Sequence, residues 1–237
     1  SNPSNPGDGE VWYNSTLGQL KGQVLGTAAW SSGGNLNTGA SSNAGFGIQT
    51  AAITAGGGTR SAQSEEYDGS SWTSLPTMRS PAPPAFIFGG CGTTTAGVTA
   101  GGMPGGQGQV ATTDEYDGSS WTGGGNMNTA RQDLGAAGTT KAAIVFAGNA
   151  APYNILNTGE NFDGSSWTET TEINTARDNV AHSCLQTATL LIGGTTPPGD
   201  SVKDLVEQWN GSSWTEIAEL NTARRSLDAG GTTTDTL

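Results

Sequence analysis

The sequence is poor in charge: Asp, Glu, Lys and Arg make up only 13% of its 237 residues, about half of the ~25% usual in globular domains. So few Glu, Lys and Arg residues nearly exclude long surface helices. The longest apolar run, residues 142–147, is far shorter than the about 20 residues that a membrane-spanning helix needs. The 9 basic residues are outnumbered by 21 acidic ones, for a net charge of −12. That balance argues against phosphate-mediated binding of nucleic acid.

The sequence also has few reactive side chains. Two cysteines do not make a disulfide framework, and there is a single histidine. Glycine is abundant instead, with 38 Gly and 10 Pro among the 237 residues. The glycines follow no period of three, which excludes collagen. The composition therefore favours an all-β protein of short strands joined by glycine-rich turns.

A repeat runs through most of the chain. Its most regular phrase, built around G-S-S-W-T, occurs four times, at Tyr67–Thr73, Tyr116–Thr122, Phe162–Thr168 and Trp209–Thr215. The four tryptophans are spaced 49, 46 and 47 residues apart. A second phrase, N-T-A-R, ends at Arg131, Arg177 and Arg224, and degenerate versions occupy 36–40 and 75–79. A fixed period of this length is the mark of a repeat architecture.

Each repeat has room for about four short strands. In the third repeat we expect them at Asp133–Thr139, Lys141–Ala147, Asn157–Asp163 and Ser166–Thr170. Asp-Gly and Asn-Gly favour the positive φ angles of hairpin turns, and aromatic residues on either side of the turn can pair across the strands. One such sheet cannot bury both faces alone, whereas copies arranged around an axis can. The period therefore predicts a β-propeller.

At this point the sequence resembles the kelch family of β-propellers. The resemblance rests on the glycine doublets, on the aromatic residue at 67, 116, 162 or 209, and on the tryptophan five residues later. It departs from the pattern at Ala147-Gly148, which replaces a doublet. The D-G-S-S-W-T and N-T-A-R wording is also similar to kelch-like repeats in tail and virion proteins of marine bacterial viruses. The segment Gly9–Gly22 resembles one that often precedes such repeats there.

The repeat boundaries predict the domain organisation. We expect residues 1–22 to be a leader with the first closing strand and 23–237 to be the propeller, with repeats at 40–75, 79–124, 131–170, 177–217 and a partial one at 224–237. Trp30 begins a phrase that aligns with Trp121. Five blades are favoured, with the closing blade built from both termini: Val11–Tyr13 and Trp30 share its sheet with Ser226–Leu237. The alternative is a larger ring.

The recurring charges have two interpretations. The four recurrent arginines and the acids two residues before each aromatic are Arg79, Arg131, Arg177, Arg224, Glu65, Asp114, Glu160 and Glu207. The arginines could clamp an anionic ligand, as in sialidases. A binding site is usually built once, however, whereas these charges recur four times. We therefore expect structural ion pairs, for which Arg–carboxylate geometry is well suited.

The recurring tryptophans Trp30, Trp72, Trp121, Trp167 and Trp214 also have two interpretations. They could stack on sugars at one site per blade, as in propeller lectins. A tryptophan at one fixed blade position more often packs between blades, and we expect that role. Trp12 and Tyr153 lie outside the pattern and are candidates for surface or ligand contacts. Tyr153 falls in a loop between strands, where propellers carry binding function.

The remaining candidates favour structural roles. His182 and Cys184 point the same way on a predicted first strand, but no third group that would orient a nucleophilic pair is evident. Cys91 and Cys184 fall on non-adjacent blades and should be free thiols. Each hairpin offers one Asp, replaced once by Asn210, which is too few oxygens for calcium. We expect no catalytic residues, metal or cofactor.

The absence of a candidate catalytic or metal site favours a non-enzymatic structural or adhesion module. The resemblance to viral proteins implies that this module is exposed on a virus particle or tail, at the virion surface or outside the cell. Its loops would meet other virion or surface proteins, or a host-surface glycan, without nucleic-acid binding or membrane insertion. The alternative is a glycan-binding lectin with sites between blades. A hydrolase or oxidase on a propeller is a third, less favoured possibility.

Overall fold

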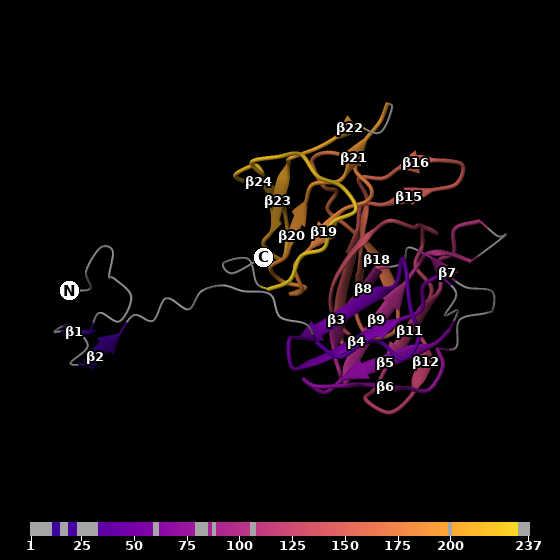
Figure 1. Ribbon diagram of the computed structural model, residues 1–237. Helices are drawn as coiled ribbons and strands as arrows, with labels where there is room; N and C mark the ends of the chain where they lie inside the picture. The colour runs from indigo at the N-terminus through magenta and orange to yellow at the C-terminus, as the bar shows by residue number, and fades with distance from the viewer. Residues whose placement is uncertain are drawn as a thin grey trace. The chain divides into compact units, whose positions relative to one another are not determined.

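The computed structural model describes residues 11–14, 19–22, 33–58, 62–78, 85–86, 89–104, 108–198 and 201–231. Contacts divide the chain into two units, Ser1–Gly33 and Gly34–Leu237, and each is considered by itself (Figure 1). All regular structure longer than a single turn in these residues is β-strand. A search of the same residues finds no helix suited in length and hydrophobicity to crossing a membrane.

The first unit contains one antiparallel hairpin. Strand β1 (Val11–Asn14) pairs with β2 (Gln19–Gly22), with Val11 opposite Gly22. Val11–Asn14 therefore has a local partner strand, and residues 226–231 contain no named strand. The expected closing sheet of Val11–Tyr13 with Ser226–Leu237 stays a prediction. A hairpin with a short loop needs far less closure entropy than a pairing across the whole chain. Trp30 and residues 232–237 lie outside the described residues.

The second unit contains four antiparallel four-stranded sheets, one for each complete repeat. Their strands, in order, are β3 (Ala44–Ile48), β4 (Ala51–Ala55), β5 (Ser64–Tyr67) and β6 (Trp72–Ser74); β8 (Gly89–Thr93), β9 (Ala96–Ala100), β11 (Thr113–Tyr116) and β12 (Trp121–Gly123); β13 (Gly135–Thr139), β14 (Ala142–Phe146), β17 (Gly159–Phe162) and β18 (Trp167–Thr170); and β19 (Ala181–His182), β20 (Leu190–Ile192), β23 (Val206–Trp209) and β24 (Trp214–Glu216). Each sheet is a simple meander in chain order. The predicted strands of the third repeat are confirmed, with ends shifted by no more than two residues.

The last hairpin of each sheet is closed by the Asp or Asn of the repeat. In the third sheet Phe162 pairs with Trp167 across the strands, and their rings stack with centroids 4.9 Å apart. Asp163 Oδ1 accepts hydrogen bonds from the backbone N–H groups of Ser165 and Ser166, both at 2.9 Å. This side-chain turn satisfies the loop backbone locally, and the same contacts recur in all four sheets.

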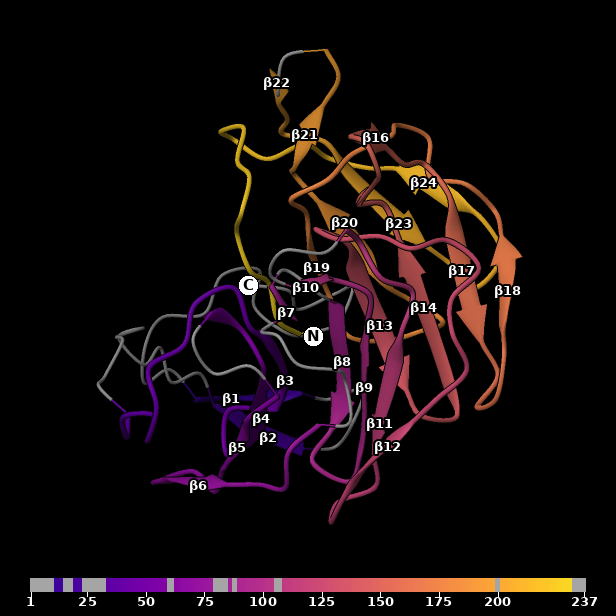
Figure 2. The same ribbon diagram turned by 90° about the vertical axis from the view of Figure 1, so that its right-hand side faces the viewer.

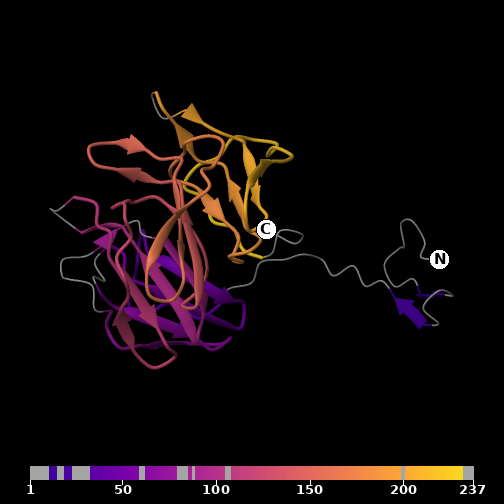
Figure 3. The same ribbon diagram turned by 180° about the vertical axis from the view of Figure 1, so that it is seen from behind.

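Smaller two-stranded sheets of the second unit lie outside the four-stranded ones. Strands β7 (Ala85–Phe86) and β10 (Met103–Pro104) form one two-stranded sheet, β15 (Asn149–Ala150) and β16 (Asn154–Ile155) a second, and β21 (Thr195–Thr196) and β22 (Ser201–Val202) a third. The hairpins β15–β16 and β21–β22 lie in the connections between second and third strands, whereas β7 precedes the first strand of its repeat. Both hairpins project beyond the four-stranded sheets (Figures 1 and 3). These loops differ in sequence between repeats, unlike the sheets below them.

The first strands of the sheets lie next to one another around a common axis, while the last strands lie at the periphery (Figure 2). Close approach between β3 and β8 requires a missing side chain: a Cβ on Gly90 would lie 2.6 Å from the Cβ of Ala44. A side chain there would therefore push the two sheets apart.

The hydrophobic core is divided among the boundaries between successive sheets. The first boundary holds Phe46, Ile53 and Trp121, and the second holds Val98, Val145 and Trp167. The third holds Phe146, Leu191 and Trp214 together with six other buried residues. Since every boundary takes residues from two repeats, the sheets stabilise one another rather than folding as independent units.

Candidate functional site

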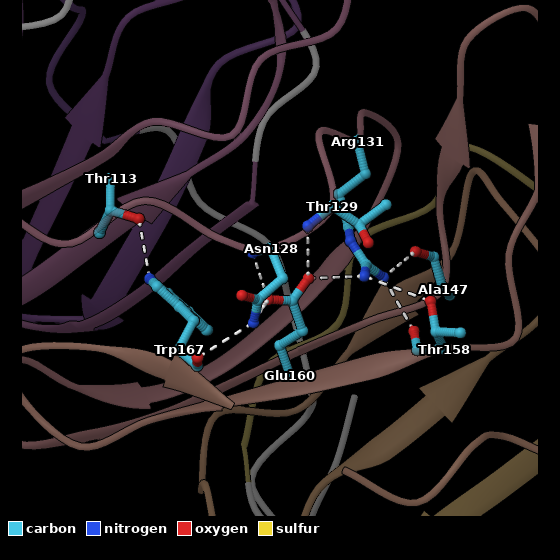
Figure 4. A network of polar contacts seen from close by, with 8 residues as sticks. All are labelled: Thr113, Asn128, Thr129, Arg131, Ala147, Thr158, Glu160 and Trp167. Carbon is cyan, nitrogen blue, oxygen red and sulfur yellow. Dashed lines mark hydrogen bonds and ion pairs between the residues drawn. The ribbon is translucent and has the colours of Figure 1, made fainter. Parts of the chain in front are cut away.

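The recurring acid and arginine of the third repeat meet in a buried network (Figure 4). Arg131 Nη2 lies 2.9 Å from Glu160 Oε1, and both side chains are no more than 1% exposed. The other terminal nitrogen of Arg131 donates to the carbonyl oxygens of Ala147 and Thr158, at 3.1 and 2.8 Å. Glu160 also accepts from Asn128, through its backbone N–H and its side-chain amide, and from the backbone N–H of Thr129.

The fourth repeat builds the same network. Arg177 Nη2 lies 2.6 Å from Glu207 Oε1, again with both side chains buried. Asn174 and Thr175 supply the same backbone donors to Glu207. Burial lowers the pKa of both arginines, and the paired carboxylates oppose that shift. Two of the expected ion pairs therefore form, and neither arginine lines any cavity described below.

These arginines also join neighbouring repeats through their backbone. The carbonyl oxygen of Arg131 accepts from the Gly102 N–H of the preceding repeat, and that of Arg177 from Gly148, both at 2.8 Å. The side chain of each arginine thus lies in its own repeat while its carbonyl is bound to the one before. This double attachment explains why N-T-A-R and the glycine doublet recur together.

The other members of the predicted set lie in different settings. Glu65 is buried and accepts from the backbone N–H groups of Asn37 and Thr38. Asp114 is also buried. Arg224 is exposed, and none of the described carboxylates pairs with it. Arg79 lies outside the described residues.

Three of the recurring tryptophans are buried between sheets, with Trp121, Trp167 and Trp214 only 6–7% exposed. Trp167 Nε1 donates to the Thr113 hydroxyl of the preceding repeat, at 3.1 Å. These rings therefore cannot serve as sugar platforms. Trp72, in the first sheet, is half-buried. Trp12 lies on β1 opposite Lys21, and the description of β1 is limited to its backbone.

Two cavities lie along the axis between the first strands. One, of about 590 Å³, is lined by hairpins that join first and second strands, including the exposed apolar residues Ile48 and Leu185. The other, of about 540 Å³, is polar and includes Asp133, Asn179 and His182. Both cavities take residues from five successive repeats, the fifth contributing Gly231 to the first cavity and Ser226–Asp228 to the second.

The candidate nucleophilic pair is divided between these cavities. His182 lines the polar cavity, where burial lowers its pKa and its buried Nδ1 has no described partner. Cys184 lies beyond the end of β19, contrary to expectation, and lines the apolar cavity. Cys91 and Cys184 are both free thiols, as predicted. Among the residues that the structure describes, no group of three or more His, Cys, Asp or Glu side chains could hold a metal ion.

A smaller cavity, of about 270 Å³ and also polar, lies between the third and fourth repeats. Its walls include Gln132, Asn149 and Asp178, which are 2–7% exposed. Tyr153, the loop residue predicted to make surface contacts, lines the same cavity and is 87% exposed. Sequence reasoning missed the three buried residues. The signal available for two of them was the polar residue directly after N-T-A-R, at 132 and 178.

Among the comparisons with known proteins, the one with solved structures bears on the architecture. No family model matches the sequence, and no curated protein matches it. The chain is similar to a solved structure described as that of YjhT, a kelch-repeat β-propeller protein, with a TM-score of 0.68 over 82% of this chain and 70% of that one. The two sequences are 14% identical, so the likeness shows the fold alone. The protein is all-β, with blade-like antiparallel sheets that match a kelch-repeat propeller.

Proposed function

We propose that the protein is a non-enzymatic structural and adhesion module, exposed on a virus particle or its tail, that presents loops to other virion proteins or to a host surface. The observation that carries this proposal is a contrast between the repeated and the unrepeated residues. The recurring charges are used inside the blades, as in Arg131–Glu160 and Arg177–Glu207. The unrepeated hairpins β15–β16 and β21–β22 project outward and expose side chains such as Tyr153.

The proposed location on a virus rests on the sequences of the repeat motifs. D-G-S-S-W-T and N-T-A-R are similar to phrases in tail and virion proteins of marine bacterial viruses. An acidic surface with a net charge of −12 is consistent with a soluble, exposed position. The proposed location is therefore the virion surface or the extracellular medium.

Immunogold labelling of intact particles with antibodies against the chain tests this location. Gold on the outer surface of undisrupted particles is the expected result. Labelling only after disruption, or only of host-cell material, would refute the proposal. Cross-linking of the particles through Lys141 or Lys203, followed by mass spectrometry, should then identify the neighbouring virion subunits.

We further propose five blades. Support comes from the two axial cavities, to which five successive repeats contribute. The segment from Ser226 would occupy the place of the first strand in the closing blade, and the Trp30 segment that of its last. If this proposal holds, Trp30→Ala in the full chain should lower the free energy of unfolding by about 3 kcal/mol, the low end of the range for truncating a core tryptophan. An unchanged unfolding midpoint would argue for a different closure, and Trp12→Ala serves as the control.

The second candidate, a glycan-binding lectin with sites between blades, is favoured by one observation. The cavity between the third and fourth repeats combines an exposed aromatic ring with buried polar side chains. Such a combination is the usual composition of a small-molecule site.

A further inference from the structure

We propose that the cavity between the third and fourth repeats binds one neutral pyranose unit of a glycan, with Tyr153 against its apolar face and Gln132, Asp133 and Asp178 accepting its hydroxyl hydrogens. This inference rests on the proposed adhesion function and names the ligand class and the site through which adhesion would occur.

The polar wall of the cavity is built before any ligand arrives. Asn149 Nδ2 donates to Asp133 Oδ2 at 3.0 Å and to Asp178 Oδ2 at 2.9 Å, so one amide holds both carboxylates. The hydroxyl of Thr195 donates to the other oxygen of Asp178, and Gln132 Nε2 donates to Asp133 Oδ2. Side chains fixed in this way lose little further entropy when a ligand binds.

One acceptor in this wall has no described partner. Gln132 is 6% exposed, and its buried Oε1 accepts no hydrogen bond from any of the described residues. A buried polar atom left without a partner costs free energy that a ligand donor can recover. Burial also raises the pKa of Asp133, whose Oδ1 accepts none of the described hydrogen bonds either. The cavity therefore lacks donors, and the hydroxyl groups of a sugar supply them.

The rim supplies the apolar half of the site. Tyr153, Ile155 and Pro197 line the cavity beside the polar wall. Tyr153 is held in the tight turn between β15 and β16, where its φ is 108° and its N–H donates to Ala150 O at 2.9 Å. A tyrosine ring offers a flat apolar face with a polar tip, and one face of a pyranose presents C–H groups. The volume of about 270 Å³ suits one sugar ring rather than a longer glycan.

The charges decide between classes of ligand. Two carboxylates, Asp133 and Asp178, disfavour an acidic sugar, because like charges in a partly buried site repel. A calcium ion is also disfavoured, because the Asn149 amide donates to both carboxylates at the point between them where a cation would have to lie. Calcium would also need six to eight oxygen ligands. A neutral, hydroxyl-rich ring satisfies both constraints.

The site is built once, as expected for a binding site rather than a structural contact. Asn149 directly follows Ala147-Gly148, which stands in the position of the glycine doublet. The corresponding residue is Met103 in the second repeat and Thr195 in the fourth. The position of Gln132, directly after the recurrent arginine, is Asp178 in the fourth repeat and Arg225 in the next. The bridging amide therefore belongs to the third repeat alone among these.

The test titrates the full chain with methyl α-D-glucopyranoside, methyl α-D-galactopyranoside and methyl α-D-mannopyranoside, followed by saturation-transfer-difference NMR. At least one should bind with a dissociation constant in the millimolar range. Tyr153→Ala should weaken that binding by about tenfold through loss of the stacked ring, while Tyr153→Phe should retain it. Val202→Ala, on the neighbouring hairpin β21–β22, is the matched control and should leave binding unchanged.

Each outcome decides the proposal. If none of the three pyranosides binds the wild-type chain, or if Tyr153→Ala binds as well as wild type, the assignment of the site is wrong. Loss of binding in a chelator such as EDTA would show a cation-dependent site and would also overturn it. None of these failures affects surface labelling of the particles, which tests the adhesion function separately.

Discussion

The third and fourth repeats and the segment from Arg224 onward contain the same N-T-A-R phrase but use it differently. Arg131 and Arg177 are fully buried against Glu160 and Glu207, whereas Arg224 is exposed. The backbone of all three is nevertheless held in the same way, because the Arg224 carbonyl also accepts from a preceding glycine, Gly194, at 2.8 Å.

The difference shows what a repeat motif encodes. The backbone bond needs only the preceding repeat, which the segment from Arg224 has. The side-chain network needs an acid on a third strand of its own repeat, 29 residues after Arg131 and 30 after Arg177. No described residue supplies that acid to Arg224. The role of the arginine is therefore fixed by a complete blade, and not by the local sequence.

The largest effect that this comparison predicts is on the buried pair. Arg177→Ala leaves the Glu207 carboxylate buried without its cation and should lower the free energy of unfolding by about 3–5 kcal/mol. Arg224→Ala removes an exposed side chain and should change it by about 0.5 kcal/mol or less. Urea denaturation of the two variants measures both. Equal losses would show that Arg224 is also paired in solution.

The recurring tryptophans allow a second comparison between equivalent positions of different repeats. Trp167 fills the boundary between the second and third sheets, so Trp167→Ala should cost about 3 kcal/mol, at the low end of the range for tryptophan truncation. Trp72 occupies the same repeat position but is half-buried, so Trp72→Ala should cost clearly less. Denaturant midpoints measure the difference, and a larger loss at Trp72 would contradict the unequal burial.

The architecture could be predicted from the sequence because its signals are local and repeated. The turn residues of D-G-S-S-W-T and the short apolar run Ala142–Phe146 mark strands whose neighbours in the sheet are also neighbours in the chain. Pairing between segments far apart in the chain carries no such local signal. The hairpin of Val11–Asn14 with Gln19–Gly22 was not among the expected strands either.

The candidate site shows a similar limit. Tyr153 could be singled out because it breaks the repeat pattern. Asn149 could not, because its importance depends on contacts between two repeats: it meets Asp178 from 29 positions away. For Gln132 and Asp178 the sequence offered only their shared position directly after N-T-A-R. The extra hairpins β15–β16 and β21–β22 were also missed, since strands of two residues carry no periodic signal.

The hairpin loops offer a smaller, pH-dependent contrast. Three sheets use Asp and the fourth uses Asn210 in the same turn. Backbone N–H groups, with Ser120 and Ser166 first, lower the pKa of Asp117 and Asp163 from 3.8 to about 2. The pKa of Asp68 is lowered well below its usual range by the same contacts. Because the folded pKa is the lower one, the stability from these carboxylates is present above about pH 4 and is lost as the pH falls towards 2.

Replacing the three aspartates with asparagine makes every turn resemble that of Asn210. The triple variant Asp68→Asn, Asp117→Asn, Asp163→Asn should therefore lose less stability than wild type over that pH window. Urea midpoints at several pH values measure this. Identical acid profiles would show that the turns keep their geometry after protonation.

The smallest predicted effect concerns the two thiols. Cys91 lies among complete repeats, whereas Cys184 contacts the last, partial repeat. Cys91 lies on β8 between β3 and β13 and is 2% exposed, and burial raises its pKa, with the Cys184 thiol adding to the shift. Cys184 is half-buried, and its N–H donates to Gly231 O of the last repeat at 3.4 Å. Burial raises its pKa as well.

Since the thiolate is the reactive form, both cysteines should react slowly with a disulfide reagent in the native protein, and Cys184 should react first. Unfolding without reductant should expose two reactive thiols, and Cys91→Ala and Cys184→Ala assign each rate. Faster labelling of Cys91 would mean that the sheets around β8 open more readily than the contact between Cys184 and Gly231. The complete repeats would then be less stable than the last one, contrary to the comparison of the arginines.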